Sequence, residues 1–181
     1  MRCIAYFCAS LVALFPWEKL AATSFLPNRL DIKQISDAPA ACLPKDGQRI
    51  LLQSAYTMEN TPQTKSTHRW KIEHVNDSKA KTLHPGECVI FGKPIDGYQQ
   101  SDTLKLEDGK TYVFVLERGD RQHAFSSSKY VGAFCVSRTP TGERAYLPYL
   151  YHQDGTVTYP SCGRYIGHPP AADGIVPPDM P

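Results

Sequence analysis

The stretch from Leu104 to Arg118 places the tightest constraint on the fold of this chain. Leu104 and Leu106 alternate with polar neighbours, as residues do on a half-buried strand, and residues 107–110 supply turn chemistry. From Tyr112 to Val115 the residues are β-branched or aromatic, and with Leu116 both faces of the alternating pattern are apolar. The stretch therefore predicts two strands joined by a turn, the second of them a central strand that is covered on both sides.

Three residues of this stretch have the spacing of a tyrosine corner. Leu106 is followed by Gly109 and then by Tyr112, at intervals of three residues. In a Greek-key sandwich such a tyrosine lies where the chain crosses between the sheets, and its phenol bonds to nearby backbone. An ordinary hairpin has the same residue types, so both interpretations stand at this point.

Further short segments with alternating or β-branched patterns are separated by turn residues. Together with the two strands above they predict about seven strands in an all-β, immunoglobulin-like Greek-key sandwich with a C-terminal extension, although short strands can also close into a barrel. The extension includes a terminal hairpin around Asp154 and Gly155. The segments are Pro27–Ile35, Arg49–Thr57, Thr67–Val75, Glu87–Phe91 and Tyr130–Arg138, with Ala145–Tyr151 and Thr156–Tyr159 in the hairpin.

The amino terminus resembles an export signal. Arg2 gives a short positive region, Ile4 to Phe15 is apolar, and Pro16 ends the apolar run. We expect residues 1–24 to be a signal peptide cleaved after Ala22 or Ser24, although an uncleaved anchor or a buried helix has a similar pattern. Residues 25–166 then form a single β-sandwich domain with its C-terminal hairpin, and residues 167–181, rich in Pro, Gly and Ala, form a disordered tail.

Membrane attachment after cleavage is not expected from this pattern. The apolar run is shorter than the roughly 20 residues that a membrane-spanning helix needs. Cys8 lies inside the run rather than after it, which argues against a lipid anchor. The pattern predicts an exported protein, with association to a membrane left open.

Export implies that the four remaining cysteines pair. Cys42, Cys88, Cys135 and Cys162 make an even set in an oxidising compartment, and four cysteines allow three connectivities. A zinc site is the alternative, but no two of them have C-x-x-C spacing. If the strands alternate in direction, the connections 36–48, 76–86 and 107–110 lie at one end of the sandwich. The pairing Cys42–Cys88 and Cys135–Cys162 is then favoured.

The same tracing places three longer, cysteine-free loops at the opposite end: Met58–Thr67, Gly92–Asp102 and Gly119–Ser128. Loops at one end of a sandwich carry recognition in antibody variable domains. Charged and aromatic residues dominate interface energy, so they are the partner-binding candidates, and soluble loops without a function are the alternative. The candidates are Glu59, Asn60, Asp96, Tyr98, Asp120, Arg121, His123 and Phe125.

The sequence offers no sign of a catalyst. His68 and His74 share a strand face but belong to no metalloprotease or deaminase motif, and no nucleophile elbow or phosphate loop is present. The net charge of +2 includes no basic stripe, so nucleic acid is not an expected partner. We expect a non-enzymatic protein with no catalytic residues, no metal ligands and no cofactor.

Between about Ala40 and Val136 the chain resembles a family of small exported bacterial proteins. The resemblance rests on the cysteine segment 41–44, the Trp70 strand, the run Leu83-His84-Pro85-Gly86-Glu87-Cys88-Val89-Ile90-Phe91-Gly92, the Leu106–Tyr112 spacing, and the strand with Tyr130 and Phe134. The family consists of type VI secretion system immunity proteins of the periplasm, usually lipoproteins. This chain departs from the family in lacking a convincing lipobox and in extending to Pro181.

The resemblance implies a protein that binds and neutralises a toxin delivered into the periplasm by a type VI secretion system. Its partner would be that secreted toxin or effector. The alternative hypothesis is an exported structural, adhesive or chaperone-like β-sandwich module with an open sheet edge for strand addition. A periplasmic hydrolase would require carboxylates or histidines that gather in one pocket.

Overall fold

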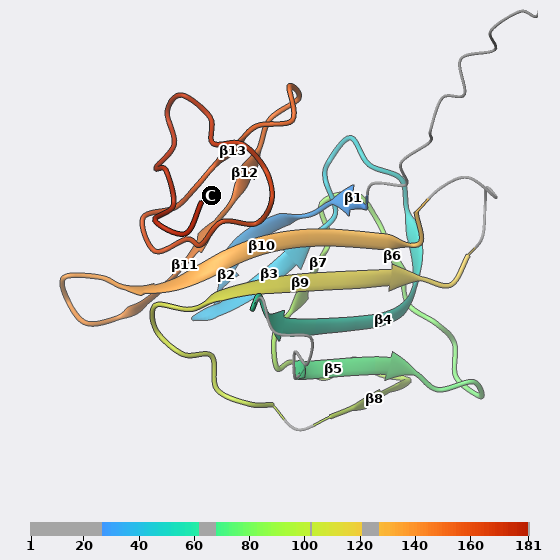
Figure 1. The fold of residues 1–181 in the computed structure, drawn as a ribbon. Coiled ribbons are helices and arrows are strands. Elements are labelled where there is room, and N and C mark those ends of the chain that lie inside the picture. Colours follow the sequence, from blue (N-terminus) through green and yellow to red (C-terminus); the bar gives the residue numbers. More distant parts are fainter. Residues whose placement is uncertain (1–26, 62–67, 102, 121–126, 181) are drawn as a thin grey trace, which may run out of the picture.

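The computed structural model describes residues 27–61, 68–101, 103–120 and 127–180. Within these residues the fold contains strands and no helix, which confirms the predicted all-β class (Figure 1). The strands are β1 (Asn28–Arg29), β2 (Asp31–Ile35), β3 (Ala38–Cys42), β4 (Ile50–Glu59), β5 (His68–His74), β6 (Thr82–Leu83), β7 (Cys88–Ile90), β8 (Tyr98–Gln100), β9 (Thr111–Arg118), β10 (Lys129–Arg138), β11 (Arg144–Pro148), β12 (Leu150–Tyr151) and β13 (Val157–Thr158).

Two sheets enclose the main hydrophobic core. The larger has the order β1-β10-β9-β4-β5-β8, with β11 also paired to β10 and β6 to β4, and the smaller has the order β2-β3-β7. Trp70, Phe114 and Phe134 are fully buried between them, together with aliphatic residues of both sheets. Gly132 on β10 allows close approach of β2, because a Cβ there would lie 2.7 Å from Cδ1 of Ile32.

β9 is the central strand that the sequence predicts. It pairs antiparallel with β10 on one side and with β4 on the other. Tyr112, Phe114 and Leu116 point into the main core, whereas Val113 and Val115 face the opposite side of the sheet. The preceding segment with Leu104 and Leu106 is not a strand, so the prediction of a strand there is wrong. Leu106 instead inserts its side chain into the core.

Tyr112 makes the bond that defines a tyrosine corner. Its side chain is fully buried, and its hydroxyl accepts a hydrogen bond of 2.8 Å from the backbone N–H of Glu107. Gly109 has φ of 75° at the turn between them, which a residue with a Cβ adopts only at a cost. This bond ties the connection that follows β8 to the start of β9.

β3 was not expected, because the sequence predicts residues 36–48 to be a connection between strands. Ser36 and Asp37 both have positive φ, as in a tight two-residue hairpin, and they reverse the chain so that β3 pairs with β2. Pro39 is tolerated because it lies where β7 ends, so only a terminal bond of that ladder is lost. Relative to β1, the additional strand reverses β4 and β5, whereas β9 and β10 keep their traced directions, so β4 and β9 are antiparallel rather than parallel.

The predicted grouping of loops into a cysteine-tied end and a free end is therefore wrong. Lys110, expected at the cysteine-tied end, lies 2.8 Å from Glu59 at the carboxyl end of β4. Gly119, expected beside Glu59, instead donates its backbone N–H to Leu51 at the start of β4. The two disulfides lie on different faces, since Cys42–Cys88 joins neighbouring strands of the smaller sheet and Cys135–Cys162 leaves the outer face of β10.

Residues 149–180 form a separate layer, which we call the C-terminal lobe (Figure 1). The expected terminal hairpin is present only in part: β12 pairs with β13, but β11 pairs with β10. The segment after residue 167 was expected to be disordered, and the structure differs. Val157 donates its N–H to Pro169 and accepts one from Ala171, and Asp179 pairs with Arg164 at 3.0 Å. Backbone bonds to β13 thus replace the side-chain core that this segment lacks.

We predict that Tyr112→Phe lowers the free energy of unfolding by about 0.5–1.5 kcal/mol, because it removes the acceptor of the hydrogen bond from the Glu107 N–H. Urea denaturation measures the change. Tyr130→Phe is the matched control, since Tyr130 is also buried on the main core and its hydroxyl bonds to none of the described residues. Equal losses in the two variants would contradict the assigned role of the Tyr112 hydroxyl.

Candidate functional site

The C-terminal lobe packs against the outer face of the large sheet, on the side away from the main core. A second hydrophobic cluster joins Ala133 and Cys135 of β10 to Tyr149, Val157 and Tyr159 of the lobe. β9 and β10 are therefore covered on both faces along part of their length. This burial explains why both alternating faces of β9 are apolar.

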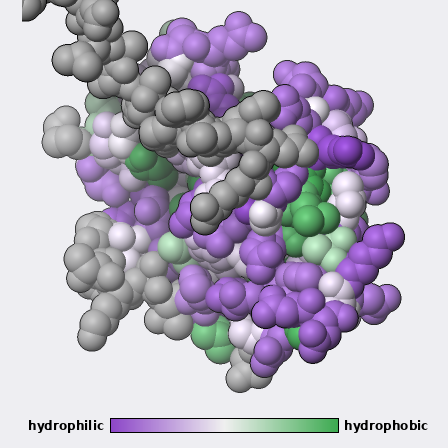
Figure 2. Space-filling model, turned by 90° about the vertical axis from the view of Figure 1, so that its right-hand side faces the viewer, coloured by the Kyte–Doolittle hydropathy of each residue, from purple (hydrophilic) through white to green (hydrophobic). Residues whose placement is uncertain are grey.

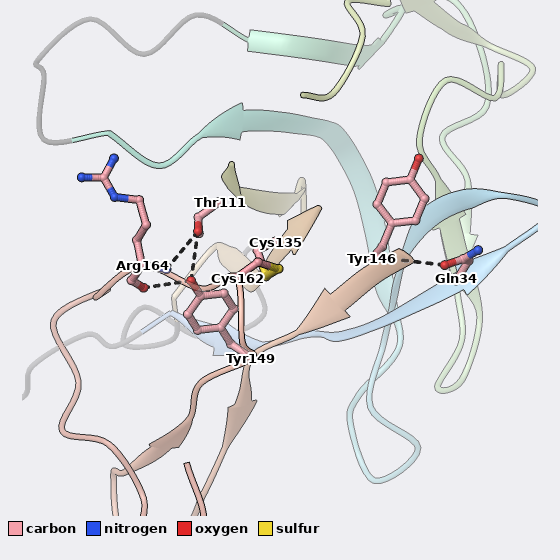
Figure 3. Close-up of a disulfide and its surroundings, with 7 residues drawn as sticks. All are labelled: Gln34, Thr111, Cys135, Tyr146, Tyr149, Cys162 and Arg164. Atoms are coloured by element: carbon pink, nitrogen blue, oxygen red, sulfur yellow. Dashed lines mark hydrogen bonds between the residues drawn. A yellow bond between two sulfur atoms is a disulfide. The ribbon is translucent and has the colours of Figure 1, made fainter. Parts of the chain in front are cut away.

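One disulfide and one hydrogen-bond ring hold the lobe in place (Figure 3). Cys135 on β10 is bonded to Cys162, and the Tyr149 hydroxyl donates to the Arg164 carbonyl at 2.8 Å. Because that bond uses the only phenolic proton, the Thr111 hydroxyl donates to Tyr149 at 3.0 Å while it accepts the Arg164 N–H at 3.1 Å. Burial raises the pKa of Tyr149 to about 12, so its hydroxyl keeps its proton at physiological pH and the ring of hydrogen bonds is preserved.

A groove of about 230 Å³ opens between the lobe and the sheet. Its floor is the outer face of β9 and β10, and the other walls come from β1, the end of β4 and the lobe. We call it the lobe groove. Its lining is mainly apolar, with a few polar groups, and consists of Pro27, Arg29, Asn60, Val113, Val131, Ala133, Tyr151, Ile166 and His168.

Tyr151 is the aromatic centre of the groove. The Arg29 guanidinium lies 5.4 Å from the centroid of its ring, within the range of a cation–π interaction, and His168 meets the ring edge-on at 5.7 Å. Burial raises the pKa of Tyr151 to about 12. The groove thus presents a neutral phenol between a permanent cation and an imidazole, next to an apolar floor, and this arrangement suits binding of a side chain with both apolar and polar parts.

A polar cluster continues the same outer face beyond the groove. The Glu117 carboxylate accepts hydrogen bonds from Ser54 at 3.0 Å and Tyr56 at 3.3 Å, and it pairs with Lys129 at 3.2 Å. Burial acts to raise the pKa of Glu117, but the bonds from Lys129 and Ser54 outweigh it and the pKa is lowered. Burial and the neighbouring carboxylate raise the pKa of Tyr56. These shifts keep the carboxylate charged and the phenol neutral.

Two of the predicted partner-binding residues lie at the carboxyl end of β4. Glu59 is largely buried and pairs with Arg69 at 2.7 Å and with Lys110 at 2.8 Å, so it stabilises the scaffold. The hydrogen bond from Lys110 is the largest cause of the lowered pKa of Glu59. Asn60 does line the lobe groove, and it is the one predicted candidate among the described residues that does so.

The other described partner-binding candidates do not line the lobe groove. The Tyr98 hydroxyl donates to the Leu52 carbonyl at 2.6 Å and accepts from Lys81, so Tyr98 fastens β8 to the sandwich. Asp120 accepts from the Leu51 N–H and lies 3.5 Å from Arg118, at the other end of β4 from Glu59. Asp96 is exposed in the turn before β8. Arg121, His123 and Phe125 lie outside the described residues.

Most lining residues of the groove were not predicted as site residues. They come from the strands and from the C-terminal segment rather than from the loops that were singled out. One signal could have pointed to them. The apolar outer positions of β9 and β10, Val113 and Val131 among them, required a cover, and only the chain after residue 139 was available to supply it.

Comparison with models of known protein families, with curated proteins and with solved structures finds no match to this chain. Within the described residues no group of three or more His, Cys, Asp or Glu side chains could hold a metal ion. The described part of the chain also contains no helix that is long and apolar enough to cross a membrane. The two disulfides indicate that the protein folds in an oxidising compartment, as exported proteins do.

We predict that replacing both Cys135 and Cys162 by Ser loosens the lobe before it unfolds the sandwich. The bond closes a chain segment with a sequence separation of 27, and its loss should cost about 3 kcal/mol. Hydrogen exchange followed by mass spectrometry should show faster exchange in residues 149–180 than in β9. Uniformly faster exchange over both regions would contradict a separate attachment of the lobe.

We also predict a pH-dependent contribution from Glu59. Its pKa is lowered from the ordinary 4.5, so its carboxylate stabilises the folded state above that pH, and the contribution disappears as the pH falls through the folded pKa. The difference in unfolding free energy between wild type and Glu59→Gln should stay constant at neutral pH and shrink below about pH 4.5. Urea denaturation over this range tests it, with exposed Glu143→Gln as the control. A difference that stays unchanged at low pH would contradict the assignment.

Proposed function

We propose that this protein is a periplasmic immunity-type binding protein that neutralises a toxin delivered by a type VI secretion system. In this proposal the lobe groove and the adjoining polar cluster receive the toxin, and the protein is not an enzyme. The resemblance of residues 40–136 to such immunity proteins supports the proposal, as do the two disulfides of an exported chain.

The size and lining of the groove carry the proposal of a protein partner. Its volume of about 230 Å³ is below the roughly 300–1,000 Å³ of typical small-molecule sites, so it fits one protruding side chain rather than a whole metabolite. Val113, Val131 and Tyr151 would surround that anchor side chain, while Arg29 and His168 contact polar atoms at its rim. An apolar pocket with a polar rim is the usual form of an interface hot spot.

We further propose that the sandwich is of the immunoglobulin-like type. β9 lies between β4 and β10 in the large sheet, β1 runs parallel to β10 at its edge, and Tyr112 makes the corner bond. In this architecture the lobe groove lies on a sheet face rather than among the end loops.

The alternative function, an exported structural, adhesive or chaperone-like module, needs a sheet edge that can accept a strand. Among the described strands β8, at one edge of the large sheet, spans only Tyr98–Gln100. At the edge of the smaller sheet, the Gln34 side chain of β2 bonds to the backbone of Arg144 and Tyr146 on β11. These edges are short or bridged, which favours recognition by the groove.

The test expresses toxins encoded beside this gene in the bacterial periplasm, with and without this protein. Wild type should restore growth against one of them, and Val131→Asp should reduce survival at least a hundredfold, because it places a charge on the groove floor. Val176→Asp is the matched control on the exposed surface, where Val176 is 62% exposed, and it should still protect. Failure of the wild type to protect against any such toxin would disprove the proposal.

A further inference from the structure

Arg118, at the carboxyl end of β9, is a buried cation with an unused donor. Only 5% of its side chain is exposed. Its Nε donates to the Asp120 carbonyl at 2.8 Å, whereas its Nη2 is buried and has no hydrogen-bond partner among the described residues. Buried N–H groups of a guanidinium are rarely left without an acceptor, because the lost hydration is not replaced.

Arg118 also lines a second cavity, of about 480 Å³, at the end of the sandwich where β9 finishes. The turn between β3 and β4 forms one wall, and β1 and the start of β10 form the other. We call it the Arg118 cavity. Its described lining residues are Asn28, Arg29, Pro44, Asp46, Gly47, Gln48, Arg118 and Tyr130. It shares only Arg29 with the lobe groove, and there the Arg29 guanidinium lies over Tyr151.

The groups around this cavity favour a negative guest. The turn that forms its wall carries Lys45 and Arg49 on exposed positions, against one exposed acidic residue, Asp46. Asp120 neutralises Arg118 only partly, since its oxygen is 3.5 Å from Nε and also accepts the Leu51 N–H. Figure 2 views this side of the molecule, whose described surface is largely hydrophilic.

We propose that the Arg118 cavity binds a carboxylate, which pairs with the positive charge of Arg118 at the cavity wall. The planar guanidinium matches a carboxylate in geometry, and Gln48 and Tyr130 are placed to add hydrogen bonds. Asp46 at the same cavity repels a doubly charged phosphate more than a singly charged carboxylate. The carboxylate comes either from a free organic acid or from an acidic side chain of a protein.

Isothermal titration at constant ionic strength tests this site, with sodium glutarate, a short glutamate-rich peptide and inorganic phosphate as probes. Wild type should bind glutarate or the peptide saturably and more tightly than phosphate. Arg118→Lys should weaken this binding at least tenfold, because lysine keeps the charge but loses the planar pair of donors. Exposed Arg138→Met is the control and should bind as wild type does. The tighter of the two carboxylate probes identifies the source.

A second variant keeps the test valid if changes at the buried arginine unfold the chain. Gln48 is exposed, so Gln48→Glu should fold, and it should weaken carboxylate binding at least fivefold by adding a like charge. The control is Gln100→Glu, on exposed β8. Undiminished binding by Arg118→Lys and Gln48→Glu, or tighter binding of phosphate, would overturn the proposal. Val131→Asp should leave glutarate binding unchanged, which separates this site from the lobe groove.

Discussion

Burial of both faces of β9 is the constraint on which the rest of this structure depends. One face of the strand completes the main core with Phe114 and Leu116, and the other carries Thr111 and Val113, which need a cover of their own. A sandwich of two sheets covers only the first face. The C-terminal lobe covers part of the second face of the sheet. The lobe groove is the space that this cover leaves open.

The attachment of the lobe combines a covalent bond with a buried polar ring. Cys135–Cys162 limits how far the lobe can move, while the ring of Thr111, Tyr149 and Arg164 fixes its position, since each hydroxyl both donates and accepts. The segment after residue 167 adds little side-chain core, so its backbone bonds to β13 hold it in place. A groove between two layers fixed in this way is pre-organised, which reduces the entropic cost of binding a partner.

The arginines near the two ends of β4 differ in their surroundings. Near Glu59 the carboxylate pairs with Arg69 and Lys110, and the lowered pKa of Glu59 reflects this stabilisation. Arg69 and Arg118 each have one buried nitrogen without a hydrogen-bond partner among the described residues. Arg118 differs in that it lines a cavity, and this position makes it the candidate for binding a ligand.

The sequence by itself determined the all-β class and the central position of β9, and the Leu106–Tyr112 spacing suggested the backbone bond of Tyr112, because alternation and turn spacing are local properties. It also favoured the cysteine pairs that are present, Cys42–Cys88 and Cys135–Cys162, although the tracing that favoured them assigned the ends wrongly. That tracing missed β3, and it made β4 and β9 parallel although they pair antiparallel. Only the tertiary structure decided that the C-terminal segment folds back on the sheet and that Arg29, Val131 and Tyr151 meet in one groove. These contacts join residues far apart in the chain, and no local pattern encodes where such residues come together.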